Sequence, residues 1–116
     1  KRARARALHD RMVNSLAEEL KLKGASVYQD KSSVDLLARW ANGEEEIFEI
    51  KTINTSNSTH QLRMGMSQVL EYQYRHWMRK GTKPRCHVVV DQDVISSWRK
   101  SFLAENNVYV KIHPVS

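Results

Sequence analysis

Apolar side chains near the N-terminus recur every four residues, which is the spacing of one face of a helix. This face consists of Leu8, Met12, Leu16 and Leu20. The pattern predicts a helix over residues 3–23, including the basic start of the chain. Gly24 is expected to end the helix, because glycine readily takes the left-handed conformation that follows many helices.

Short apolar stretches separated by turn residues follow this helix. They predict strands over residues 25–30, 34–40 and 46–52, with a turn at 31–33 between the first two. Asn42 and Gly43 separate the second and third strands, and Asn-Gly is a preferred centre of a tight hairpin. We therefore expect the three strands to form an antiparallel meander.

Helical spacing of apolar residues returns in the second half of the chain. A polar loop precedes a predicted helix over about 60–80, and a strand at 85–91, apolar on both faces, is expected to be central. A helix over 94–106 and a strand over 108–112 complete the chain. The expected N-caps of the two helices are Ser58 or Thr59 and Asp91 or Asp93. The order α-β-β-β-α-β-α-β, without a linker or repeat, predicts one α/β domain over residues 1–116.

The predicted helix at 60–80 has two unlike faces. The expected core face carries Leu62, Met66, Val69 and Trp77. The opposite, polar face carries Gln61, Gly65, Gln68, Tyr72, Arg75 and Arg79. A face of this composition suits a surface that meets a phosphate backbone. Trp40 and Trp98, like Trp77, are expected to fill the core and its edges.

Composition narrows the class of protein. The net charge of +6 favours a polyanionic partner such as nucleic acid, and no apolar run is long enough to span a membrane. Cys86 is the single cysteine, so no internal disulfide can form, and we expect it to be buried. A reducing, cytoplasmic setting is therefore expected. Because the sequence starts at Lys1, we also expect a piece of a longer chain.

Charged residues inside the apolar strands are the candidate chemistry. Glu49 and Lys51 alternate with Phe48 and Ile50, so the two charged side chains share a face. A hairpin centred on Asn42-Gly43 pairs residues whose numbers sum to about 85, which puts Asp35 across from residue 50, within one register step. Asp35 and Glu49 are thus expected to be neighbours, with Lys51 beside them.

Two readings of this cluster remain open. Adjacent carboxylates suit Mg²⁺, which prefers oxygen ligands and keeps waters, one of which can attack a phosphodiester. A lysine beside the metal can orient that water or stabilise the developing charge. The alternative is structural: Glu49 forms an ion pair with Lys51 or Arg39 at a half-exposed sheet surface.

The segments "VDLLARW", "IFEIKT" and "QVLEY" resemble the PD-(D/E)XK nuclease superfamily, over about residues 8–91. The resemblance implies a restriction-endonuclease-like αβββαβ core, with a mixed central sheet flanked by helices, here followed by a further helix and strand. Gln68 and Tyr72 resemble the Q-x-x-x-Y motif of RecB-type nucleases. Val34 stands where the superfamily's name-giving proline would be.

The resemblance also implies roles for individual residues. Asp35, Glu49 and the main-chain carbonyl of Ile50 would bind the metal. Lys51 would be the catalytic lysine, while Gln68 and Tyr72 would support it or contact the DNA backbone. The cofactor would be Mg²⁺, with Mn²⁺ able to substitute.

Further residues are weaker candidates for the same site. His9 lies on the inward face of the first predicted helix and is a possible site residue. The expected phosphate contacts are Asn57, Arg63, Arg75 and Arg79.

The sequence thus predicts a Mg²⁺-dependent nuclease domain that hydrolyses DNA, in a homodimer or beside further domains. The alternatives are a catalytically inactive nucleic-acid-binding or subunit-docking module of this fold, and a partner-docking domain whose ion pairs are structural.

Overall fold

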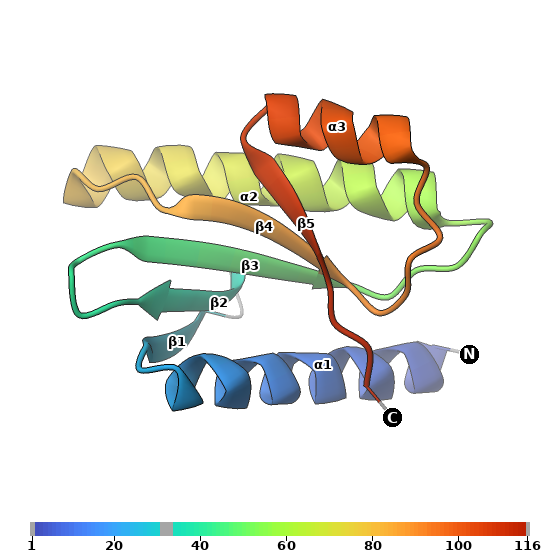
Figure 1. Cartoon of the computed structure of the whole chain (residues 1–116), viewed down its shortest axis with the longest axis horizontal. Helices are drawn as coiled ribbons and strands as arrows, with labels where there is room; N and C mark the ends of the chain where they lie inside the picture. Colours follow the sequence, from blue (N-terminus) through green and yellow to red (C-terminus); the bar gives the residue numbers. More distant parts are fainter. Residues whose placement is uncertain (1, 31–33, 116) are drawn as a thin grey trace.

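A five-stranded mixed sheet lies between one helix on one face and two helices on the other (Figure 1). The structure is a computed structural model that describes residues 2–30 and 34–115, so the predicted turn at 31–33 lies outside the described residues. The elements are α1 (Arg2–Leu22), β1 (Ser26–Asp30), β2 (Val34–Arg39), β3 (Glu45–Lys51), α2 (Ser58–Lys80), β4 (Arg85–Val90), α3 (Ser97–Glu105) and β5 (Val108–Ile112).

The strands lie in the order β1-β2-β3-β4-β5. The first three pair antiparallel, which confirms the predicted meander. β4 pairs parallel with β3 and with β5, because the crossovers through α2 and α3 return the chain to the same end of the sheet. β4 is an inner strand as its apolar character predicted, although β3 occupies the middle of the sheet.

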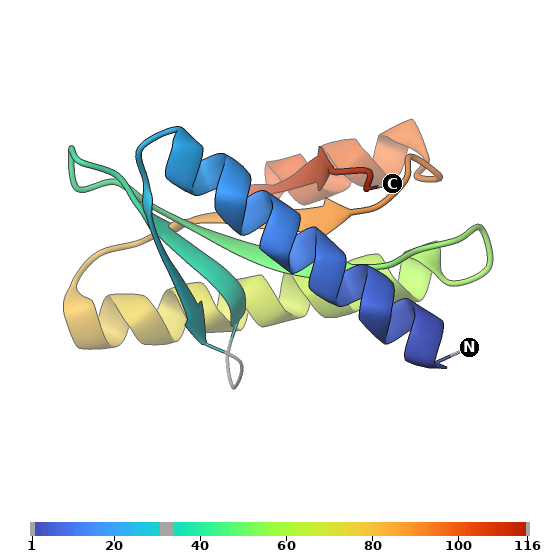
Figure 2. The same cartoon turned by 90° about the horizontal axis from the view of Figure 1, so that it is seen from below.

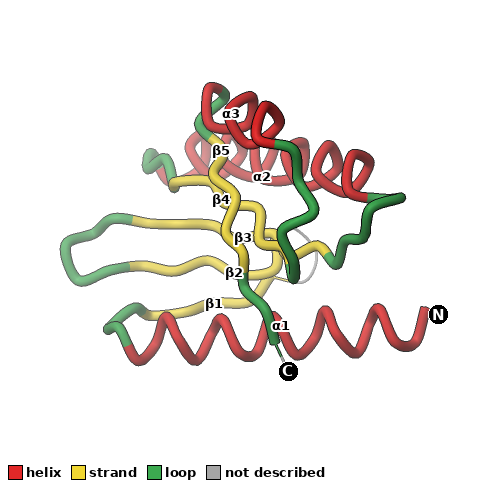
Figure 3. The backbone as a smooth tube through the Cα atoms, turned by 45° about the vertical axis from the view of Figure 1, so that its right-hand side comes forward, coloured by secondary structure: helices red, strands yellow, loops and turns green. Residues whose placement is uncertain are grey.

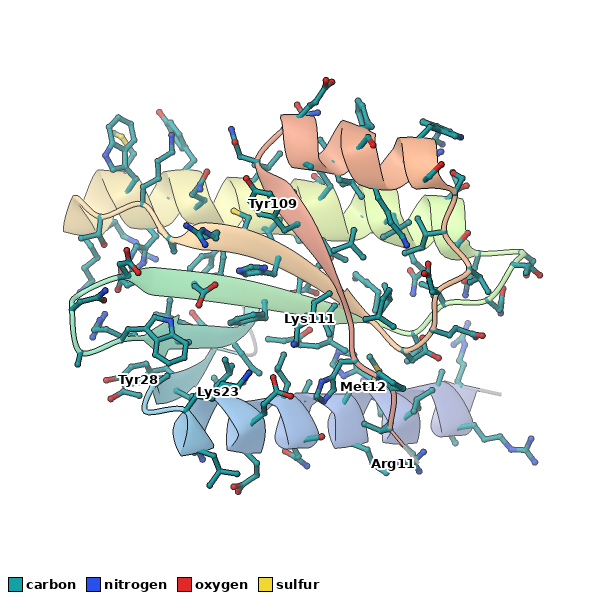
Figure 4. The ribbon with its side chains drawn as sticks, viewed as in Figure 1. Arg11, Met12, Lys23, Tyr28, Tyr109 and Lys111 are labelled. Atoms are coloured by element: carbon teal, nitrogen blue, oxygen red, sulfur yellow. The ribbon has the colours of Figure 1, made fainter. Side chains whose placement is uncertain are left out.

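Two hydrophobic layers hold the helices on the sheet. On one face, α1 packs against the side chains of Leu36, Phe48 and Ile50 through the buried positions Met12, Leu16 and Leu20, as its spacing predicted. Figure 4 shows Met12 directed from α1 toward the sheet and Arg11 directed away. On the other face, α2 and α3 cover Ile47, Val88 and Val90. α1 runs obliquely across its face of the sheet (Figure 2).

The face of α2 that packs on the sheet differs from the one predicted. Its buried residues are Leu62, Gly65, Val69, Tyr72 and His76. Gly65 and Tyr72 therefore belong to the core face, whereas Trp77 is 47% exposed. Trp98 on α3 is also exposed, so the expectation that the tryptophans fill the core is wrong for two of three. Trp40 is partly buried against the α1 layer, as expected.

Gly65 allows α2 to approach the sheet closely. A Cβ at this position would lie 3.0 Å from Cγ1 of Val88 and 3.6 Å from Cγ of Lys51. A Cβ here would crowd Val88 of β4 and come into ordinary van der Waals contact with Lys51 of β3. Gly65 is therefore selected by contact distance, a property that helical periodicity does not reveal.

The helix ends also differ from the predicted caps. Asn57 and Ser96 occupy the N-cap positions of α2 and α3, and neither forms a side-chain cap hydrogen bond. Asp91 instead accepts a hydrogen bond from the main-chain N–H of Ile53, at 2.8 Å. Asp93 pairs with Lys100. Gly81 directly follows α2 and takes the left-handed conformation that ends many helices.

Cys86 is fully buried, as predicted. In the described part of the chain, no helix combines the length and apolar character needed to cross a membrane.

A buried carboxylate fastens the C-terminal half of α2 to the sheet. Glu45 at the start of β3 pairs with Arg39 of β2 at 2.8 Å and with His76 of α2 at 3.1 Å. Thr82, just after α2, donates a hydrogen bond to the same carboxylate. Burial raises the pKa of Glu45, but the hydrogen bonds from Thr82, Arg39 and His76 outweigh it and hold the pKa below its usual value.

We predict that Glu45→Gln destabilises the fold at pH 7 by about 1–3 kcal/mol, because it removes charge-assisted hydrogen bonds from a buried site. A carboxyl whose folded pKa is depressed stabilises the protein above its unfolded pKa, and this stability is lost as pH falls through the folded pKa. Urea unfolding should therefore show the gap between wild type and variant closing below about pH 4. The exposed neighbour supplies the control, Glu44→Gln; an equal loss in both variants would contradict the role of Glu45.

Candidate active site

Asp35 lies where β2 and β3 cease to pair. The last paired residues are Leu36 and Phe48, in a register whose numbers sum to 84, one step from the expected value. The next main-chain N–H on β3, that of Ile50, donates to Oδ2 of Asp35 at 2.8 Å. The carboxylate thus replaces a strand partner, and this hydrogen bond determines its position at the end of the hairpin.

Glu49 lies directly beside Asp35, as the sequence predicted. Its Oε1 accepts a hydrogen bond from the main-chain N–H of Asp35 at 3.3 Å, and the residue is only 7% exposed. Burial, and then the negative charge of Asp35, raise the pKa of Glu49 to about 7. A buried carboxylate beside a second, partly buried one is a place where a bound cation would relieve repulsion.

Lys51 completes the cluster on the same strand. Its Nζ is 3.6 Å from Oε2 of Glu49, and the side chain is largely buried. This contact fits both the catalytic reading and the structural ion pair considered from the sequence. Arg39, the other proposed partner of Glu49, pairs with Glu45 instead, so that part of the structural alternative is wrong.

His9 of α1 faces the site, as its place on the apolar face predicted. Its Nε2 is 3.1 Å from Oδ2 of Asp35, and Nε2 is the donor because a carboxylate can only accept. The hydrogen bond that His9 donates to Asp35 raises the pKa of His9 above its usual value. His9 therefore restrains the Asp35 carboxylate from the side opposite α2.

An open pocket of about 630 Å³ adjoins this carboxylate. It is lined by Arg6, His9, Asp10, Val13, Asn14, Gln29 and Asp35. Arg6 brings a cation to the pocket that the sequence reasoning did not single out. The available signal was its spacing, since Arg6 precedes His9 by one helical turn on the same face.

Gln68 and Tyr72 face the sheet from α2. Oε1 of Gln68 is buried and accepts no hydrogen bond from any described residue. An orphaned buried oxygen is costly and is typical of a position that a ligand or a moving donor completes. Tyr72 is 8% exposed and lies in the core, stacked on His76. The expectation that its face meets DNA is therefore corrected.

The residues expected to contact phosphates are spread along α2 and the loop that precedes it. Asn57 is partly buried, and its Oδ1 accepts a hydrogen bond from the main-chain N–H of Asn54 at 2.8 Å. Arg63 is exposed near the start of α2. Arg75 and Arg79 are exposed in the C-terminal half. At about 1.5 Å per residue, Arg75 lies some 15 Å along the axis from Gly65, so the structure does not bring it to the site.

The donor set suits a hard divalent cation. Among the described residues, no group of three or more His, Cys, Asp and Glu side chains is placed to hold a metal ion. The candidate ligands are instead the carboxylates of Asp35 and Glu49, with the main-chain carbonyl of Ile50 as the predicted third. Few protein ligands and several waters are what Mg²⁺ prefers.

The comparisons with known proteins bear on the fold. No family model matches the chain, and no curated protein matches its sequence. The structure is similar to the crystal structure of a repair endonuclease from Pyrococcus abyssi, with a TM-score of 0.62 and 18% sequence identity. The match covers 89% of this chain and 45% of that one, so this chain spans less than half of that structure. The fold is restriction-endonuclease-like.

We predict that Glu49→Gln stabilises the metal-free protein at high pH. The folded pKa of Glu49, about 7, lies above its usual value of 4.5, so wild-type stability falls as pH rises between these values. The variant lacks this loss and should be more stable at pH 8 by on the order of 2–3 kcal/mol, with little difference at pH 4.

Urea unfolding in EDTA at both pH values measures this effect. Glu18→Gln, at an exposed position of α1, is the control for loss of one negative charge. If wild type and Glu49→Gln lose stability equally between the two pH values, Glu49 is not the strained group.

Proposed function

We propose that this chain is a Mg²⁺-dependent nuclease domain that hydrolyses DNA phosphodiester bonds, with Mn²⁺ able to substitute. The observation that carries the proposal is the grouping of Asp35, Glu49 and Lys51 where two strands separate, beside an open pocket. The restriction-endonuclease-like fold, shared with a repair endonuclease, supports it.

Asp35, Glu49 and the Ile50 carbonyl would hold the cation. Mg²⁺ bound there supplies a water of lowered pKa as nucleophile and neutralises charge on the phosphate. Asp35 is already oriented for this role by two donors, the Ile50 N–H and His9. The charge of Glu49 is buried beside that of Asp35, and both effects oppose it. A cation bound to Glu49 would relieve this repulsion.

Lys51 is the group that would act on the reacting atoms. Its ammonium contacts Glu49, and with that carboxylate bound to a cation it has donors free to orient the attacking water or stabilise the pentavalent phosphorus. Gln68 is a positioning residue in this scheme. Its unpartnered Oε1 lies one helical turn from Gly65, whose backbone approaches the Lys51 stem, and it would accept a hydrogen bond from that ammonium.

Basic side chains around the site would bind the DNA backbone. Arg6 lines the pocket next to Asp35, and Arg63 and Asn57 lie at the start of α2, where main-chain N–H groups lack helical partners. The net charge of +6 favours the approach of a polyanion. We propose a cytoplasmic location for this activity, and a second copy or a further domain to select the DNA structure that is cut.

The alternative is a module of the same fold that binds DNA or another subunit without cleaving. One observation favours it: Lys51 pairs with Glu49 in a contact that a purely structural ion pair would also form. Binding of DNA in Mg²⁺ and Mn²⁺ without cleavage would select this alternative.

We predict that Lys51→Ala lowers Mg²⁺-dependent cleavage at least about 100-fold, because it removes a charged group aimed at the transition state. Rates are measured on linear, circular, single-stranded and branched DNA. Lys51→Met retains the apolar stem against Gly65 and tests the same loss if the alanine variant unfolds. Lys83→Ala, at an exposed position after α2, is the matched control and should cleave normally. Wild-type rates in both Lys51 variants would refute the proposal.

A further inference from the structure

A groove between α2 and α3 has no role in the site described above. Its volume is about 450 Å³, and the two helices that form it lie side by side over one face of the sheet (Figure 3). The groove is lined mainly by Arg63, Met66, Leu70, Trp98, Arg99 and Phe102.

Two large aromatic side chains of α3 face solvent at this groove. Trp98 is 61% exposed and Phe102, one helical turn later, is 45% exposed. The core contact of α3 is made by Leu103, which is fully buried, so neither aromatic ring is needed to hold the helix. Exposed aromatic residues on one face of a helix, next to a hollow, are typical of a binding surface.

The cations at the groove narrow the kind of partner. Arg63 reaches it from α2 and Arg99 from α3, and the described lining includes no carboxylate. The guanidinium of Arg99 lies 4.5 Å from the centre of the Trp98 ring, which extends the flat surface that the ring offers. Flat aromatic surfaces alternating with cations match a chain of bases and phosphates. A protein partner would instead have to supply acidic groups for both arginines.

The groove opens at the same end of the molecule as the candidate site. α1, α2 and α3 all begin at the end where β3 finishes, and Figures 1 and 2 agree on this arrangement. Arg63 lies within the first two turns of α2, between the groove and the loop that follows Lys51. A DNA strand bound at the site could therefore continue past the start of α2 into the groove.

We propose that the α2–α3 groove binds unpaired bases of a DNA strand that extends from the cleavage site. Trp98 and Phe102 stack on the bases, while Arg63 and Arg99 contact the intervening phosphates. The proposal rests on the proposed function in taking DNA as the ligand. It concerns binding alone, so it can fail or succeed independently of catalysis.

The test compares two exposed tryptophans of the same protein. Trp98→Ala removes the proposed stacking surface. Trp77→Ala removes a Trp that is also exposed and also lies beneath a cation, Lys83, but at the other end of α2. Fluorescence anisotropy in EDTA measures binding to an oligothymidine and to a blunt duplex of equal length. We expect Trp98→Ala to weaken oligothymidine binding about tenfold, with a much smaller effect on the duplex and none from Trp77→Ala.

Two further measurements separate the alternatives. Phe102→Ser should also weaken oligothymidine binding, and circular dichroism should show that this variant keeps the fold. The proposal is overturned if the wild type does not bind oligothymidine, or if Trp98→Ala and Trp77→Ala behave alike. It is also overturned if Trp98→Ala changes only the sedimentation of the protein, which would make the groove a protein interface. Cleavage by Lys51→Met tests the proposed function separately.

Discussion

The hydrogen bond from the Ile50 N–H to Asp35 is the constraint on which the candidate site depends. An antiparallel hairpin whose strands separate leaves main-chain donors without partners, and a buried donor must find one. Asp35 supplies that partner from its side chain. The same bond therefore ends the β2–β3 pairing and places a carboxylate beside Glu49, where its charge acts on a buried neighbour.

This placement has an energetic cost that suits a functional site. The charge on Glu49 is opposed by its burial and by the nearby charge of Asp35, and both effects destabilise the metal-free protein. Lys51 offsets part of this repulsion, and the orphaned oxygen of Gln68 adds a further unsatisfied group nearby. At the other end of β3, Glu45 is fully hydrogen-bonded to Arg39, His76 and Thr82. β3 thus carries two unlike carboxylates. Glu45 is stabilised by hydrogen bonds and supports the fold, whereas the charge of Glu49 is destabilised and is available to a ligand.

The parallel crossovers explain why three basic side chains from different helices lie at one end of the sheet. Each crossover helix must start where its preceding strand finishes, so α2 and α3 begin beside the end of β3. α1 begins there as well (Figure 1). Arg6, Arg63 and Arg99, far apart in sequence, consequently surround the same end of the sheet. Topology therefore brings together three cations that come from different helices.

Local pattern was enough to predict the element order, the meander and the inward face of α1 with His9 on it. It was also enough to group Asp35, Glu49 and Lys51, because strand alternation and an Asn-Gly hairpin determine which side chains share a face. The face of α2 was misjudged. Tyr72 and Gly65 were assigned to the polar face, but contact with β3 and β4 buries both of them. Periodicity groups residues into faces, but it does not show which elements pack on each face.

What the sequence by itself determined is therefore the set of elements and the charged cluster within one hairpin, since both depend on short-range geometry. The tertiary structure alone decided that Arg6 adjoins Asp35, that Oε1 of Gln68 has no partner and that Trp98 lines a groove with Arg63. Each of these joins segments distant in the chain. Their distances depend on how helices cross the sheet, which no local pattern specifies.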